Sequence, residues 1–215
     1  MKKRILFQGD SITDCGRKRE EFYGMGSGYA NLVKASLGMD RPDEFEFVNR
    51  GISGNRIVDL YARMKIDLIN LAPDYASIYI GVNDVWHEIA KGNGVATPKF
   101  EKIYRMLLEE VQEALPQTKL FLIAPYVLHG TATENTEEKP DRWERFQFEV
   151  PEKAEVVKKL AKEFGLPCIE LQPAFDKACE SAPPEYWARD GVHPTACGHE
   201  IIKRLWLKVF EEIQG

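Results

Sequence analysis

Short apolar runs and longer amphipathic stretches alternate along this chain of 215 residues. Runs such as Ile5-Leu6-Phe7 and Ile78-Tyr79-Ile80 have the length of buried strands, whereas other stretches repeat apolar residues at helical spacing. This alternation is typical of βαβ units and predicts an α/β fold with a parallel sheet. Strands are predicted at 4–8, 45–49, 76–81, 119–124 and 166–171, and helices at 28–37, 58–71, 98–115, 152–164 and 195–213.

One long segment interrupts the alternation, at about residues 126–150. It is polar over 131–140 and then carries three aromatic residues, Trp143, Phe146 and Phe148. Long connections inside a compact domain are usually functional or disordered. We therefore predict one domain over 1–215 with a long loop insertion at about 126–150, which either flanks the substrate or is a surface insertion.

Composition and charge narrow the range of partners. The formal net charge is −5 and no basic stripe is present, which argues against a nucleic-acid partner. The four cysteines form no Cys-x-x-Cys pair and no Cys/His metal spacing, so no metal is expected and the thiols are expected to be reduced. No apolar run has the length of a secretion signal or a membrane span, which predicts a cytoplasmic protein with no membrane partner.

Four polar blocks each follow a predicted strand. They are Gly9-Asp10-Ser11, the glycine loop 51–54, Gly81-Val82-Asn83-Asp84, and Asp190 to His193. Each block taken alone is an ordinary turn or helix cap. The carboxyl ends of parallel strands meet at one edge of a sheet, where open α/β sheets bind their ligands. We therefore expect the four blocks to lie together.

The chemistry of these blocks is complementary. Ser11 stands on a strand-to-helix turn, where a hydroxyl is exposed, and backbone N–H groups of such turns can face a ligand. The Asn83 amide offers further N–H donors. A carboxylate at Asp190, three residues before His193, can orient that imidazole as a general base. Nucleophile, base and donors to an oxyanion are the three roles that acyl transfer needs.

With these blocks the chain resembles the SGNH-hydrolase superfamily, also called GDSL-like esterases and lipases. The resemblance runs from residue 9 to 194 and implies a flavodoxin-like three-layer α/β/α sandwich with a five-stranded parallel sheet in the order 2-1-3-4-5. It implies Ser11 as nucleophile, with Asp190 and His193 completing the triad. It also implies that the Ser11 and Gly54 N–H groups and the Asn83 side chain form the oxyanion hole. No cofactor is implied.

Longer strings point to a narrower group. Residues 9–17, 26–29, 51–55 and 81–86 resemble bacterial intracellular acetylxylan esterases that deacetylate xylo-oligosaccharides, which implies an acetylated sugar as substrate and a homo-oligomer. Ile12 replaces the leucine of the GDSL pattern. A lipid or acyl thioesterase, or a lysophospholipase-type esterase, is the alternative within enzymes. A non-catalytic carbohydrate-binding protein is the alternative from another class.

Further side chains near the blocks are candidates for substrate contact. They are Asp10, Trp86 and Trp187. Trp86 either stacks on a sugar face or packs in the core, and Trp187 either forms a wall of the site or is structural. We expect His87 to be exposed to solvent and His199 to be structural.

Overall fold

The structure, a computed structural model, describes residues 2–214. Its five strands form one all-parallel sheet in the order β2-β1-β3-β4-β5, so the predicted α/β class and strand order are confirmed. The first strand is paired on both sides, with Ile5 beside Phe47 of the second strand and Tyr75 of the third. The strands are β1 (Lys3–Gly9), β2 (Phe45–Asn49), β3 (Tyr75–Tyr79), β4 (Lys119–Ala124) and β5 (Cys168–Glu170).

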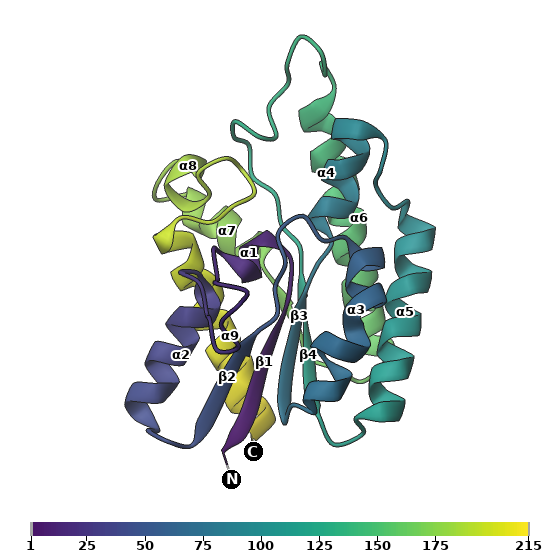
Figure 1. The fold of residues 1–215 in the computed structure, drawn as a ribbon. Coiled ribbons are helices and arrows are strands. Elements are labelled where there is room, and N and C mark those ends of the chain that lie inside the picture. The colour runs from purple at the N-terminus through teal and green to yellow at the C-terminus, as the bar shows by residue number, and fades with distance from the viewer. Residues whose placement is uncertain (1, 215) are drawn as a thin grey trace.

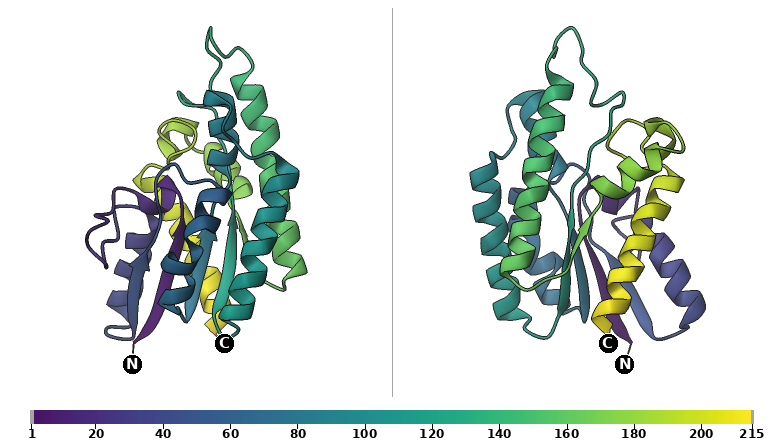
Figure 2. Two further views of the ribbon diagram at one scale, coloured as in Figure 1. Left: turned by 45° about the vertical axis from the view of Figure 1, so that its right-hand side comes forward. Right: turned by 180° about the vertical axis from the view of Figure 1, so that it is seen from behind.

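Helices cover both faces of the sheet, which gives the expected three layers (Figure 1). Alternate residues of β1 point to opposite faces: Ile5 and Phe7 belong to one apolar cluster and Leu6 to the other. The first cluster includes side chains of α2 (Tyr29–Asp40), α7 (Gln172–Cys179) and α9 (Ala196–Gln214). The second includes side chains of α3 (Ile57–Asp67), α5 (Thr97–Ala114) and α6 (Arg142–Glu163), and Figure 2 shows both layers from two further sides. Burial on both faces explains why the strands are continuous apolar runs.

The predicted loop insertion at 126–150 is too long at its C-terminal end. Helix α6 begins at Arg142, ten residues before the predicted start at Glu152. A proline normally marks the end of a helix, but α6 continues through Pro151. The part of the helix before this proline is held by Phe146 and Val150, which are one turn apart and fully buried. The connection between β4 and α6 therefore spans 125–141, and Figure 1 shows it rising past the edge of the sheet beside α4.

Several elements were not predicted. Helix α4 (Val82–Lys91) follows directly on the Gly81 turn, where only a turn was expected. The other unpredicted helices are α1 (Ser11–Asp14), α7 (Gln172–Cys179) and α8 (Pro184–Trp187). The helix predicted at 58–71 is α3 followed by the 3₁₀ turn η1 (Ile69–Leu71). Because α7 and α8 intervene, the block Asp190 to His193 follows α8 instead of the fifth strand, yet it lies at the same edge of the sheet as Ser11. None of the helices within residues 2–214 combines the length and apolar character that crossing a membrane requires.

Candidate active site

The turn after β1 presents the hydroxyl of Ser11. Ser11 Oγ lies 3.0 Å from Nε2 of His193, which is 182 residues further along the chain. Asp10 caps α1, since its Oδ1 accepts the N–H of Ile12 at 3.0 Å. Within residues 2–214 the N–H of Ser11 has no acceptor, so the turn offers both a hydroxyl and a free donor.

The loop before α9 orients His193 through Asp190. Asp190 Oδ2 accepts the Nδ1–H of His193 at 2.7 Å, and Oδ1 accepts the backbone N–H groups of His193 at 2.7 Å and Val192 at 3.0 Å. Burial alone would raise the pKa of Asp190, but the hydrogen bonds from His193 and Val192 outweigh it and lower this pKa to about 2. The ionised carboxylate keeps the proton on Nδ1, so the Nε2 lone pair is free to accept the proton of Ser11.

Donors from two other loops reach the same cavity. Asn83 stands in the first turn of α4, and its Nδ2 donates one N–H to the Asn55 carbonyl at 3.1 Å, which fixes the amide and leaves the second N–H available. Gly54 has a φ of +82°, a conformation that favours glycine, and its N–H has no acceptor among the described residues. Ser11, Gly54 and Asn83 all line one cavity, an arrangement that can hold an oxyanion.

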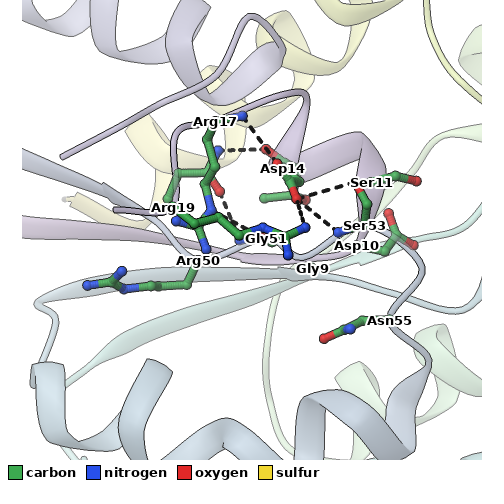
Figure 3. A network of polar contacts seen from close by, with 12 residues as sticks. Gly9, Asp10, Ser11, Asp14, Arg17, Arg19, Arg50, Gly51, Ser53 and Asn55 are labelled. Carbon is green, nitrogen blue, oxygen red and sulfur yellow. Dashed lines mark hydrogen bonds and ion pairs between the residues drawn. The ribbon is translucent and has the colours of Figure 1, made fainter. Parts of the chain in front are cut away.

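A buried carboxylate ties the nucleophile turn to the glycine loop. Asp14 Oδ2 accepts the backbone N–H of Ser53 at 2.9 Å and a guanidinium N–H of Arg19 at 2.7 Å. Figure 3 shows Asp14 beside Gly51 and Ser53. The two backbones approach so closely that a Cβ on Gly51 would lie 2.3 Å from the Asp14 nitrogen. The position of Gly54, the next residue after Ser53, therefore depends on Asp14.

The cavity has a volume of about 1040 Å³, and Trp86 and His193 lie on its wall. Their ring centroids are 5.7 Å apart, and Trp86 also packs edge-on against Phe146 at 6.0 Å, so it has contacts with both the cavity and the core. Trp187 is not among the lining residues. Its indole N–H donates to the Ala182 carbonyl at 3.2 Å, so the structure does not bring it to the site as predicted.

The predicted substrate contact at Asp10 does not fit the structure. Its side chain is fully buried beneath the nucleophile turn and caps α1 instead of reaching the cavity. Burial raises its pKa to about 7. Asp10 therefore acts from behind the site, on the position of the turn.

A second histidine lies beside the cavity next to a cysteine. His199 Nε2 is 3.4 Å from Cys15 Sγ, while its Nδ1 accepts the backbone N–H of Tyr29 at 3.1 Å. Burial lowers the pKa of His199 to about 4, so the ring is neutral and carries its proton on Nε2. Its only lone pair is occupied by Tyr29, so His199 donates to Cys15 and cannot act as its base. The structural role expected for His199 fits this arrangement.

Among the basic side chains that line the cavity, sequence reasoning missed His87, Lys91 and Arg189. The expectation that His87 is exposed was wrong, because it is half-buried on the wall. His87 and Lys91 follow Asn83 by four and eight residues, so one face of α4 brings all three to the cavity. Helical spacing from Asn83 is the signal that could have found them. Within residues 2–214, no group of three or more His, Cys, Asp or Glu side chains gathers as a metal site would need.

Comparison with known proteins identifies the family. The model of the GDSL-like lipase/acylhydrolase family matches residues 7–201. The acetylxylan esterase of Geobacillus stearothermophilus is 35% identical over 216 residues, covering 96% of this chain and 93% of that enzyme.

Solved structures are similar over nearly the whole chain. That of a putative GDSL-like lipase from Parabacteroides merdae matches with a TM-score of 0.89 and 36% identity, over 97% of this chain and 96% of its own. The acetylxylan esterase Axe2 from Geobacillus stearothermophilus matches with a TM-score of 0.81 and 35% identity, over 96% and 93%. Two mutants of that enzyme, one at an aspartate and one at a serine, are described as catalytic. This chain belongs to the GDSL-like lipase/acylhydrolase family and is a carboxylic ester hydrolase.

Proposed function

We propose that this enzyme removes acetyl groups from xylo-oligosaccharides, with Ser11 as nucleophile, His193 as base and Asp190 as the residue that orients the base. The observation that carries the proposal is the unbroken chain of hydrogen bonds from Ser11 Oγ through His193 to Asp190, at 3.0 and 2.7 Å. The similarity to an acetylxylan esterase over almost the full chain supports the substrate.

The first half of the reaction forms an acyl-enzyme. His193 Nε2 takes the proton of Ser11 as Oγ attacks the ester carbonyl carbon, and the carbonyl oxygen becomes an oxyanion. The N–H groups of Ser11, Gly54 and Asn83 stabilise this oxygen, and each such donor is typically worth a factor of about 10²–10³ in rate. The tetrahedral intermediate then loses the sugar alkoxide, which takes the proton from His193.

The second half returns the enzyme to its starting state. Water gives a proton to His193 Nε2 and attacks the acetyl carbonyl carbon. The second tetrahedral intermediate breaks its bond to Ser11 Oγ, which recovers the proton from His193. Acetic acid leaves and gives its remaining proton to water, which yields acetate. Asp190 stays ionised throughout and stabilises the imidazolium. Every proton is accounted for by chain residues and water, so the proposal requires no cofactor.

Hydrolysis of p-nitrophenyl acetate, butyrate and octanoate by the wild type and Ser11→Ala tests the proposal, with acetylated xylo-oligosaccharides as the next substrates. We expect acetate to be preferred and Ser11→Ala to lose at least ~10³ of kcat. Ser181→Ala is the matched control, since Ser181 is exposed between α7 and α8 and does not line the cavity. Thermal unfolding checks that both variants fold.

Each other outcome points elsewhere. A preference for octanoate would favour the lipid or thioesterase alternative. Activity that survives in Ser11→Ala would refute the mechanism. Absence of hydrolysis of any ester would leave the carbohydrate-binding alternative.

We keep three further predictions as part of this proposal: one domain over the whole chain, a cytoplasmic location, and a homo-oligomer. Light scattering coupled to size exclusion tests the last, and a mass equal to that of one chain would contradict it. Fractionation of the cells that make the protein tests the location.

A further inference from the structure

The charged side chains on the cavity wall are lysine and arginine. Lys91 and Arg189 line the cavity, and no aspartate or glutamate is among its lining residues. The chain as a whole has 34 acidic against 29 basic residues. The cavity therefore has the opposite sign of charge to the molecule that contains it.

Both cations are free of protein partners. Lys91 and Arg189 are exposed, and within residues 2–214 neither has a carboxylate oxygen within 4.0 Å. Other arginines near the site differ in this respect. Arg19 binds Asp14 at 2.7 Å, and Arg56 binds Asp59 at 2.9 Å. The two unpaired cations thus stand where a ligand can reach them.

Their chemistry selects the ligand. Lysine and arginine side chains donate hydrogen bonds and cannot accept them, and a planar guanidinium matches the two oxygens of a carboxylate or phosphate. A neutral sugar has no charge that would interact with these two cations. An anionic group on the substrate would be attracted by both cations.

The position of the cations indicates whether the acyl group or the sugar of the ester carries the anion. Lys91 is eight residues beyond Asn83 on α4, which places the two backbones about 12 Å apart along the helix axis. Arg189 immediately precedes the Asp190 loop and lies near α8, which stands across α1 from α4 in Figure 1. An acetyl group held at the oxyanion donors has only two carbons and cannot span to Lys91. The anion belongs on the sugar.

We propose that the preferred substrate is an acetylated sugar that carries an anionic group, attracted into the cavity by the positive charges of Lys91 and Arg189. This inference rests on the proposed function and narrows its substrate class. The carboxylate of an acidic sugar unit and the phosphate of a phosphorylated sugar share the required chemistry, and the test distinguishes them.

The test compares three substrates acetylated at the same hydroxyl: a methyl glucoside, the corresponding methyl glucuronoside, and the methyl glucoside 6-phosphate. Initial rates of acetate release are measured at low ionic strength and in 0.5 M salt. The proteins are wild type, Lys91→Gln, Arg189→Gln and the double variant. Lys208→Gln is the control with the same loss of charge, because Lys208 is exposed on α9 and does not line the cavity. The nearby Trp206 binds Ser77 in the middle of β3, which places this part of α9 away from the sheet edge that carries the site.

We expect wild type to have a lower KM for at least one charged substrate than for the neutral one. Each single variant should reduce this preference by about two- to fivefold, and the double variant or added salt should abolish it. Lys208→Gln should keep it. The better of the two charged substrates identifies the anion as carboxylate or phosphate.

The results that would overturn the anion site differ from those that would refute the proposed function. Equal kcat/KM on all three substrates would overturn the anion site and leave the sugar esterase intact. A preference that persists in the double variant, or is lost in Lys208→Gln, would also overturn it. Hydrolysis of p-nitrophenyl acetate with no release of acetate from the three sugars or from acetylated xylo-oligosaccharides would refute the proposed function itself, and the anion site with it.

Discussion

Asp10 is a carboxyl group that is fully buried and out of contact with solvent. Its Oδ1 accepts the Ile12 N–H at 3.0 Å, and its Oδ2 has no partner among the described residues. A buried carboxylate oxygen with no donor is costly, and protonation relieves that cost. Burial accordingly raises the pKa of Asp10 from 3.8 to about 7.

This buried group predicts a dependence of stability on pH. Because the pKa is higher in the folded than in the unfolded state, the contribution of Asp10 to stability is present below about pH 4 and is lost as the pH rises to 7. Asp10→Asn keeps an acceptor for Ile12 and cannot ionise. Wild type should therefore lose more stability between pH 5 and pH 8 than the variant, by at most ~3 kcal/mol.

Urea unfolding at the two pH values measures this difference. Asp40→Asn is the control, because Asp40 is exposed at the end of α2 and its loss should leave the pH dependence of wild type unchanged. Parallel behaviour of wild type and Asp10→Asn would contradict the argument.

At the scale of elements, the site depends on how helix α1 is joined to the glycine loop after β2. Asp14 Oδ2 makes that junction by accepting the Ser53 N–H, and Arg19 adds an ion pair from a half-exposed side chain. Burial by itself raises the pKa of Asp14, but Arg19 and the Ser53 N–H outweigh it and lower this pKa, so the group is ionised. The ionised form is an acceptor only, which suits both donors.

Replacing Asp14 by asparagine should misplace Gly54 and lower kcat. Ser53 and Arg19 both bind Oδ2, and Oδ1 accepts the Arg17 N–H at 3.2 Å, so the single oxygen of an amide keeps only one of these sets. Even where it takes the place of Oδ2, a neutral oxygen binds the Ser53 N–H and the Arg19 guanidinium more weakly than a carboxylate does. We expect roughly a tenfold fall in kcat with little change in KM, since about 1.4 kcal/mol of transition-state stabilisation corresponds to that factor.

Arg19→Gln is the control for Asp14→Asn. It removes the same ion pair and leaves the bond to Ser53, and an exposed ion pair contributes little. If both variants lose kcat equally, the ion pair and not the junction to the loop positions Gly54. If neither does, Asp14 has no positioning role.

The elements also show where sequence reasoning ends. The five strands were predicted because burial on both faces makes most of their positions apolar, although the edge strands β2 and β5 each keep a glutamate. Helix α6 was predicted only from residue 152, since Pro151 conceals a helix whose earlier half is fixed by burial of Phe146 and Val150. Helix α4 was missed because its first turn reads as the Gly81 turn, and with it the cavity residues His87 and Lys91 were missed.

For the whole molecule, the topology of a parallel sheet made the four polar blocks predictable as neighbours. What could not be predicted were contacts between segments distant in sequence, since those depend on the packing of whole layers. The bond between Asn83 and the Asn55 carbonyl is one example. The support of the His193 loop by the connection at 125–141 is another.

The connection at 125–141 fits neither predicted alternative, a loop that flanks the substrate or a surface insertion. Its first half is bonded to the backbone of the triad loop: the Leu128 N–H donates to the Gly191 carbonyl at 2.8 Å, and the Tyr126 hydroxyl to the Val192 carbonyl at 3.0 Å. None of the residues 125–141 lines the cavity. The connection therefore holds the loop of Asp190 and His193 from behind.

Gly130 is the point at which this support can be tested. A Cβ there would lie 2.5 Å from the Asp190 carbonyl carbon, so Gly130→Ala must push the two loops apart. A displacement of about 1 Å at a catalytic group can cost a factor of ~10² in rate. We expect kcat to fall by up to that factor, measured well below the unfolding temperature so that the folded enzyme alone is compared.

Glu137→Ala, at an exposed position of the same connection, should leave kcat and the unfolding temperature unchanged. A Gly130→Ala enzyme that is folded and fully active would show that His193 is positioned by Asp190 alone.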